Sequence, residues 1–116
     1  MFCINKRKTG SRYEDQAAAF LEKQGLLVME KNFRCKSGEI DLIARDGKYL
    51  VFVEVKYRAN RWGGHPLEAV DRNKKRRIRG AAQFYLLRHG FPETTPCRFD
   101  VVGILGDEIV HIENAF

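Results

Sequence analysis

The chain has few of the residues that mark several common classes of protein. Its three cysteines, Cys3, Cys35 and Cys97, are far apart and form no CxxC pair, which argues against a disulfide framework and against a zinc site. No apolar run approaches the roughly 20 residues that a membrane-spanning helix needs. The segment from Met1 to Lys8 lacks the apolar block of a signal peptide. These absences predict a cytoplasmic protein with reduced thiols and no membrane contact.

Length and charge narrow the range further. At 116 residues, with no internal repeat and no low-complexity linker, the sequence predicts a single domain spanning residues 1–116. The net charge of +6 comes without an acidic tail and favours an anionic partner such as nucleic acid. Charge alone does not identify that partner, and the sequence leaves the oligomeric state open, with a homodimer as one option.

The stretch from Gly38 to Lys56 is the most informative part of the sequence. Two β-rich runs flank Asp46-Gly47, a pair that predicts a type I′ hairpin. Alternation along the two predicted strands places six apolar residues on one face, which must cover a core. These residues are Ile40, Leu42, Ala44, Val51, Val53 and Val55.

The opposite face of this hairpin carries Glu39, Asp41, Glu54 and Lys56, with Ile43, Leu50 and Phe52 beyond them. In the predicted register Asp41 is diagonal to Glu54, about 7–8 Å away between backbones. Two clustered carboxylates suit a divalent cation, because like charges on neighbouring strands otherwise repel. An ordinary polar face with a local Glu54–Lys56 ion pair explains the spacing equally well, so the spacing leaves both interpretations open.

Two motifs carry a family resemblance. Asp41 followed by Glu54-Val55-Lys56 resembles the D…ExK signature of the PD-(D/E)xK, restriction-endonuclease-like nucleases. Residues 38–43 (GEIDLI) and 52–58 (FVEVKYR) are more similar still to the YraN family, which is placed in that superfamily with a Holliday-junction-resolvase-like fold. The resemblance extends from Glu14 to the end of the chain. Ile40 stands where the superfamily signature has proline, a position that is not a ligand.

The resemblance implies an α/β fold, a restriction-endonuclease-like sandwich with a central mixed β-sheet flanked by helices. It also implies a metal-dependent nuclease that cleaves DNA, including branched or otherwise structured DNA. Asp41, Glu54 and the Val55 carbonyl would bind Mg²⁺ or Mn²⁺, and Lys56 would orient the attacking water or stabilise charge. A glutamate from the first helix, here Glu14, often completes such sites in the superfamily.

Glu14 has a second interpretation. Ser11-Arg12-Tyr13-Glu14 has the form of a capping box, which predicts a helix that begins near Ser11 and ends at Gly25. In that case the Glu14 side chain accepts a backbone N–H at the start of the helix. Residues 1–10 would then form a basic, mobile arm. Both roles for Glu14 stay open at the level of sequence.

Four further elements are predicted. A strand covers Leu26 to Phe33, and a helix capped by Asp71 continues to about His89. Residues 98–105 and 108–112 form a hairpin about Gly106-Asp107, in which Asp100 is expected to pair with Arg98 or with a loop amide.

Basic residues near these elements are candidates for nucleic-acid contacts, although solvation is the usual fate of a single surface cation. Trp62 lies in a glycine-rich loop, where it would stack on an unpaired base or fill the edge of the core. The candidate phosphate ligands are Arg34, Lys36, Arg58, Arg61, Lys74, Lys75 and Arg77.

Two alternatives to a nuclease remain. One is a nucleic-acid-binding protein that has the nuclease fold but little or no catalysis. The other is a protein-interaction module whose basic surface meets an acidic partner. Cleavage with and without Mg²⁺ separates the first hypothesis from both, and the salt dependence of binding separates the two alternatives from each other.

Overall fold

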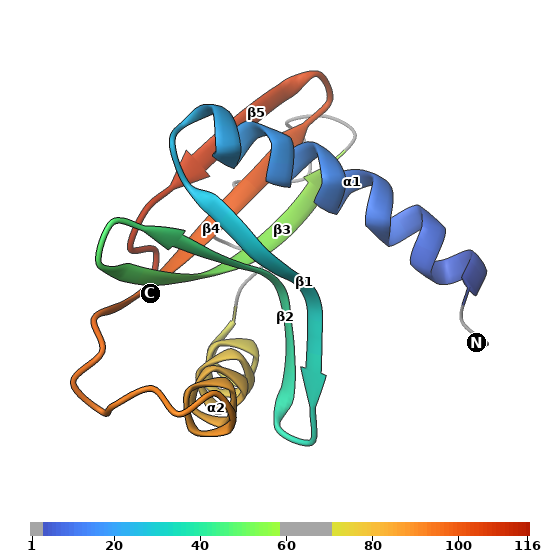
Figure 1. The fold of residues 1–116 in the computed structure, drawn as a ribbon. Helices are drawn as coiled ribbons and strands as arrows, with labels where there is room; N and C mark the ends of the chain where they lie inside the picture. The colour runs from blue at the N-terminus through green and yellow to red at the C-terminus, as the bar shows by residue number, and fades with distance from the viewer. Residues whose placement is uncertain (1–3, 59–70) are drawn as a thin grey trace.

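The computed structural model describes the backbone of residues 4–58 and 71–116, and the side chains among them from Arg12 onward. These residues form a five-stranded mixed sheet with the strand order β1-β2-β3-β4-β5, together with two helices (Figure 1). The elements are α1 (Ile4–Lys23), β1 (Leu27–Cys35), β2 (Gly38–Asp46), β3 (Tyr49–Arg58), α2 (Arg72–Arg88), β4 (Cys97–Leu105) and β5 (Glu108–Ile112).

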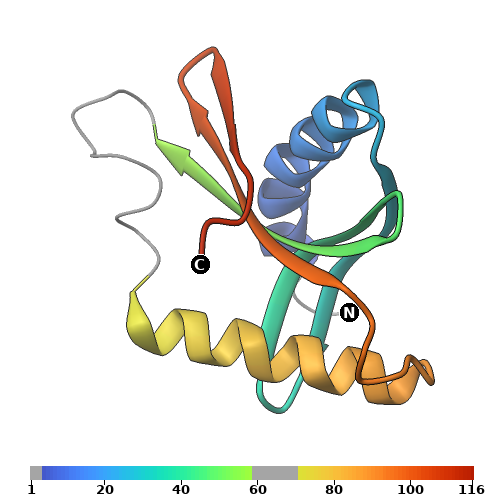
Figure 2. The same ribbon diagram turned by 90° about the vertical axis from the view of Figure 1, so that its left-hand side faces the viewer.

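The helices cover opposite faces of the sheet. Neighbouring strands are antiparallel except for β3 and β4, which run parallel and are therefore joined by a crossover that contains α2. Figure 2 shows α2 beneath the sheet and α1 on its far side. The predicted α/β sandwich with a central mixed sheet is confirmed, and the arrangement is compatible with a restriction-endonuclease-like fold.

Each face of the sheet has its own core, which explains why β3 is apolar on both sides. On the α1 side, Leu21 packs in a cluster with Leu42 and Val53. On the α2 side, Phe52 packs in a cluster with Tyr85, and the two rings meet edge to face. Strands covered on both faces read as nearly continuous apolar runs rather than as alternating ones. The sequence analysis required a core only on the face that carries Leu42, Val51 and Val53.

The turn of the central hairpin lies further along the chain than the sequence predicted. Asp46 pairs with Tyr49, so the turn residues are Gly47 and Lys48 rather than Asp46 and Gly47. Gly47 has a φ of +59°, whereas Lys48 is not among the residues with positive φ. This pattern is typical of a type II′ turn, not of the predicted type I′ turn. Glycine takes this conformation without the steric cost of a Cβ atom.

The new turn changes the pairing of β2 with β3 but not the faces of their side chains. Leu42 lies opposite Val53, so the register differs from the predicted one by an even number of residues. The predicted register, from which the diagonal relationship of Asp41 to Glu54 was drawn, is therefore wrong by two residues. Asp41 and Glu54 themselves lie just beyond the last pair of this ladder.

β2 leaves the central ladder at Asp41. Its pairing with β3 ends at Leu42, while its pairing with β1 continues beyond that point. Ile40 consequently packs on the α2 side together with Ile43. The prediction that Ile40 shares a face with Leu42 and Ala44 is wrong, because strict alternation holds only while a strand stays in a regular ladder.

The helix boundaries test two capping predictions. Asp71 caps α2 as predicted, and its Oδ1 accepts the backbone N–H of Lys74 at 2.8 Å. The predicted capping box at Ser11 is wrong, because α1 begins at Ile4 and Ser11 lies inside the helix. Within the described part of the chain, neither helix is both long and apolar enough to cross a membrane.

Candidate metal centre

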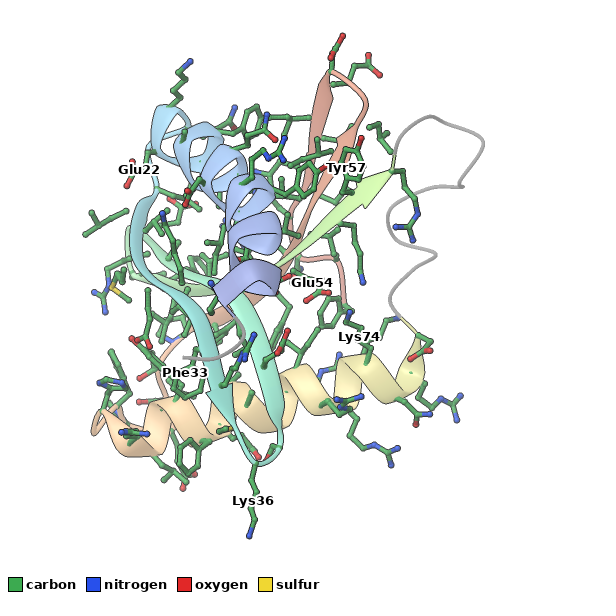
Figure 3. The ribbon with its side chains drawn as sticks, turned by 90° about the vertical axis from the view of Figure 1, so that its right-hand side faces the viewer. Glu22, Phe33, Lys36, Glu54, Tyr57 and Lys74 are labelled. Carbon is green, nitrogen blue, oxygen red and sulfur yellow. The ribbon has the colours of Figure 1, made fainter. Side chains whose placement is uncertain are left out.

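The predicted acidic residues meet in one pocket of about 230 Å³, between α1 and the start of α2. Figure 3 shows Glu54 between the two helices, with Lys74 on the α2 side and Tyr57 beside α1. The pocket is lined by Tyr13, Glu14, Glu39, Asp41, Glu54, Val55, Lys56, Tyr57 and Lys74. Four chain segments that are distant in sequence therefore contribute to a single site.

The carboxylate of Asp41 accepts a backbone hydrogen bond from β3 at a position where the backbone of β2 no longer pairs with β3. Its Oδ2 accepts the N–H of Val55 at 2.8 Å. In a continuing antiparallel ladder Val55 would exchange both of its hydrogen bonds with Ile40, but β2 has already turned away. The N–H and the carbonyl of Val55 point to the same side of β3. The carbonyl of Val55 therefore faces the side on which Asp41 lies.

The surroundings of Asp41 disfavour its ionised form. Burial and the charge of Glu54 raise the pKa of Asp41 to about 8, although the Val55 N–H partly opposes the shift. Glu14 adds a smaller repulsion in the same direction. At neutral pH Asp41 therefore holds a proton that an arriving cation would displace.

Glu54 is nearly buried, with 5% of its surface exposed, and it contacts two ammonium groups. Its Oε2 lies 2.7 Å from Nζ of Lys74 and 3.2 Å from Nζ of Lys56. Burial and then the neighbouring Lys74 lower the pKa of Lys56. Burial also lowers the pKa of Lys74, but its hydrogen bonds with Glu54 and Lys56 outweigh burial and the net shift is upward.

Glu14 belongs to this pocket and not to a helix cap. It is 8% exposed, and among the described residues its Oε1 atom has no hydrogen-bond partner. Burial raises the pKa of Glu14, while hydrogen bonds of the carboxyl group with Asn32 and Asp41 partly oppose the rise. Asn32 adopts a φ of +55° within β1, a left-handed conformation in which asparagine is enriched. The structure thus favours a place for Glu14 in the acidic pocket over a capping role.

The donor set is one that could hold a hard divalent cation. Asp41, Glu54 and the Val55 carbonyl offer oxygen atoms, and Glu14 supplies a buried oxygen that lacks a partner. Oxygen donors suit Mg²⁺ or Mn²⁺ rather than zinc. No group of three or more His, Cys, Asp or Glu side chains in the described residues is arranged as a ready metal site.

Comparison with known proteins assigns this chain to a family. The model of the uncharacterised protein family UPF0102 matches residues 13–104, a range that contains all four candidate ligands. The chain belongs to the UPF0102 family. This is the YraN family that the motifs around Asp41 and Glu54 indicated, so that resemblance is confirmed.

Relatives within UPF0102 match along nearly the whole chain. A UPF0102 protein of Lachnoclostridium phytofermentans is 51% identical over 113 residues, which cover 97% of this chain and 96% of the relative. One from Janthinobacterium sp. (strain Marseille) is 46% identical over 110 residues, covering 95% and 88%. A third, from Persephonella marina, is 41% identical over 116 residues, covering 100% and 97%. The names of these relatives state no activity.

The basic run on α2 of this UPF0102 chain does not form one surface. Lys74 enters the acidic pocket, whereas Nζ of Lys75 lies 5.8 Å from the centre of the Phe116 ring. Arg77 lies on another flank of the helix, where its backbone and Cβ approach Gly38 so closely that a Cβ at Gly38 would be only 2.9 Å from the Arg77 carbonyl oxygen. The sequence predicted all three cations as candidate phosphate ligands.

Three other predicted phosphate ligands, Arg34, Lys36 and Arg58, lie outside the acidic pocket. Arg34 pairs with Glu39 at 3.3 Å, and Lys36 points outward from the tip of the β1–β2 hairpin (Figure 3). Nη1 of Arg58 donates to the Tyr57 carbonyl at 2.8 Å. None of these three side chains lines the acidic pocket. Arg61 and Trp62 lie outside the described residues.

Sequence reasoning missed an aromatic pair at the pocket mouth. The rings of Tyr13 and Tyr57 stack with their centres 4.1 Å apart, and the Arg12 guanidinium lies 5.9 Å from the Tyr13 ring centre. The available signal was the position of Tyr57, directly after the ExK motif. Tyr13 and Tyr57 form one wall of the pocket.

A second polar cluster lies away from this pocket and has a structural role. Asp100 is fully buried, accepts two hydrogen bonds from Arg98 at 3.0 Å and accepts the backbone N–H of Asn114. Nε2 of His111 lies 2.7 Å from its Oδ2. Burial raises the pKa of Asp100, but the hydrogen bonds from His111 and Arg98 prevail and lower it overall. Both partners predicted for Asp100, Arg98 and a loop amide, are confirmed.

Proposed function

We propose that this protein is a metal-dependent endonuclease that cleaves phosphodiester bonds in DNA, including structured or branched DNA. The observation that carries the proposal is the meeting of Glu14, Asp41 and Glu54 in one pocket beside Lys56. Three carboxyl groups in a buried space are costly unless a cation binds them. The Asp41 pKa of about 8 and the unpartnered oxygen of Glu14 are two signs of that cost.

Each pocket residue has a role in this proposal. Asp41, Glu54 and the Val55 carbonyl would hold Mg²⁺ or Mn²⁺, and Glu14 would bind a metal-bound or neighbouring water. The cation, when bound, would supply a water of lowered pKa and neutralise charge on the phosphate. Lys56, only 15% exposed at its side chain, is held beside Glu54 and would stabilise charge developing on the phosphate oxygens.

Lys74 has a second position available in the proposed complex. In the structure its ammonium group contacts Glu54 at 2.7 Å, yet 40% of its side chain remains exposed. Once a cation holds Glu54, the flexible lysine stem allows the ammonium group to turn toward a DNA phosphate. Electrostatic attraction of this kind is independent of base sequence.

Cleavage by the purified protein is the direct test. A four-way DNA junction and a linear duplex of the same strands are incubated with Mn²⁺, with Mg²⁺, or with Ca²⁺ as a binding control. We expect cleavage with Mn²⁺ or Mg²⁺, and at least a hundredfold slower cleavage by Asp41→Asn and Glu54→Gln. The matched control is Glu39→Gln, since Glu39 lines the pocket but pairs with Arg34 at the surface. Equal rates in all three variants would refute the assignment.

One observation favours the alternative of a nucleic-acid-binding protein with little catalysis. Lys56 and Lys74 both contact the same oxygen of Glu54, so the carboxylate already has cationic partners without a metal. In that case DNA binding would show a steep salt dependence but no metal dependence. Wild-type protein that binds the junction and leaves it uncut in Mn²⁺ would support this alternative.

A further inference from the structure

A second hollow lies on the same side of the sheet as Glu54, between α2 and the strands β3 and β4. Its volume is about 450 Å³, which is within the usual range for small-molecule sites. Its walls are formed largely by Phe52, Phe99, Cys97 and Leu86, with Arg76 and Arg79 at the α2 side. No acidic side chain is among the described residues that line it.

The aromatic rings at this hollow stack in a series, and the guanidinium group of Arg79 lies near two of them. Phe52 stacks on Phe99 with ring centres 5.5 Å apart, and Phe99 stacks on Phe116 at 5.4 Å. The Arg79 guanidinium lies 5.9 Å from the centre of the Phe99 ring and 5.7 Å from that of Phe116. Because Phe52 and Phe116 stack on Phe99, its ring edge is the part left for a ligand. An apolar hollow beside exposed guanidinium groups is complementary to a ligand with an aromatic ring and a negative charge.

The position of Phe52 connects this hollow to the acidic pocket. Phe52 and Glu54 are two residues apart on β3 and so lie on the same face of the sheet, about 7 Å apart along the strand. The first turn of α2 contributes Lys74 to the acidic pocket, and the next turns contribute Arg76 and Arg79 to the hollow. Figure 2 shows the C-terminal end of the chain above α2, on this same side of the sheet.

We propose that the hollow binds one unpaired nucleotide of the DNA strand, with its base against the edge of the Phe99 ring and its phosphate at Arg79 and Arg76. The identification of the ligand as a DNA nucleotide rests on the proposed function. The side-chain amide of Gln83, which also lines the hollow, is a hydrogen-bonding group for a base edge. The protein would therefore select DNA in which a paired region adjoins an unpaired nucleotide. An unpaired nucleotide distinguishes flapped, tailed and gapped DNA from a plain duplex.

The test measures binding without cleavage, so it is independent of catalysis. A short duplex with a single-stranded tail containing 2-aminopurine is titrated in Ca²⁺ at fixed salt. The references are the blunt duplex and a duplex whose tail has abasic nucleotides. We expect the base-containing tail to increase affinity about tenfold over the abasic tail, and 2-aminopurine fluorescence to change as the base enters the hollow. Phe99→Leu should abolish both effects, and Phe99→Tyr should retain them.

A charge variant on α2 tests the phosphate contact. Arg79→Gln should weaken binding of the tailed duplex while leaving the blunt duplex nearly unchanged. Arg88→Gln is the matched control, because Arg88 is an exposed cation on the same helix that does not line the hollow. Melting temperatures of all variants establish that they are folded.

The outcomes separate this site from the proposed function. Equal affinity of the wild type for base-containing and abasic tails overturns the nucleotide site, even if the protein cleaves DNA in Mn²⁺. Base-dependent binding that is lost in Phe99→Leu supports the site, even if no cleavage is found. Equal losses of affinity for the tailed duplex in Arg79→Gln and Arg88→Gln would mean that Arg79 acts only through the overall positive charge of the helix. That result would contradict the proposal.

Discussion

The ammonium group of Lys74 lies 2.7 Å from Oε2 of Glu54 and so links the first turn of α2 to the centre of the sheet. A residue that the sequence predicts as part of a surface charge run is thereby a member of the acidic pocket. The contact also makes Lys74 a competitor for any metal ion that binds Glu54. This competition leads to the first of four predictions.

Replacing Lys74 should strengthen the response of the protein to metal. In Lys74→Met the apolar stem remains, but Glu54 loses one of its two cationic partners. We expect Mn²⁺ to raise the melting temperature more in this variant than in the wild type, because binding to the native state alone stabilises it. The control is Lys75→Met, which removes the same charge from the neighbouring position. Identical Mn²⁺ shifts in both variants would contradict the competition.

The raised pKa of Asp41 predicts how stability depends on pH. Between the ordinary pKa of 3.8 and the native value of about 8, the folded protein holds a proton that the unfolded chain has released. The free energy of unfolding should therefore fall as pH rises through this window, by up to about 1.4 kcal/mol per pH unit from this group. Above about pH 8 the contribution should level off.

Asp41→Asn should remove this part of the pH dependence, since the amide does not titrate. Urea unfolding at several pH values between 5 and 8 measures the slope in each protein. Asp107→Asn, an exposed change in the β4–β5 turn, should keep the wild-type slope. A slope that is unchanged in Asp41→Asn would show that other groups bind the proton.

Lys56 offers a test that separates catalysis from binding. Lys56→Met keeps most of the stem and removes the ammonium group that contacts Glu54 at 3.2 Å. Loss of a preorganised electrostatic contact of this kind typically costs about 10²–10³ in rate. Single-turnover cleavage of a junction in saturating Mn²⁺ should slow by this factor, with affinity in Ca²⁺ nearly unchanged. Retained cleavage with weaker binding would place Lys56 on the DNA-contacting surface instead.

The buried network around Asp100 should matter for stability and not for metal binding. Asp100→Asn leaves Arg98 without its fully buried carboxylate, and breaking such a pair typically costs about 3–5 kcal/mol. Urea unfolding should show this loss, while the Mn²⁺-induced shift of melting temperature should remain. Glu113→Gln is the control, because exposed Glu113 is 4.0 Å from Arg98 and a weak surface pair contributes about 1 kcal/mol or less. Equal losses of unfolding free energy in Asp100→Asn and Glu113→Gln would contradict this prediction.

Much of the fold follows from local sequence signals. Asp71 is a residue type that favours helix starts, and Gly106-Asp107 is a pair that favours hairpin turns, so both elements are found where the sequence predicts them. The turn after Asp46 was less well specified, because Asp46-Gly47 and Gly47-Lys48 both supply a glycine. Pairing across the whole hairpin, rather than turn propensity, decides between the two.

The residues of the acidic pocket also divide into those that the sequence could place and those that it could not. Asp41, Glu54 and Lys56 lie on one hairpin, so alternation along its strands is sufficient to bring them to one face. Glu14 and Lys74 come from helices, and the sequence could not decide between a capping or a solvated role and a place in the pocket. They line the same pocket as Glu54 because the packing of both helices on the sheet brings them to the point where β2 leaves the ladder.

The sequence by itself determined the alternation of the hairpin and, through its motifs, membership of the family. Tertiary structure alone decided three things: the bend of β2 at Asp41, the entry of Lys74 into the acidic pocket, and the separation of Lys75 and Arg77 onto different flanks of α2. The physical reason is the separation along the chain of the residues that each feature depends on. Strand alternation and turns depend on neighbouring residues, whereas the burial and pairing of a charge depend on segments that only the packed core brings together.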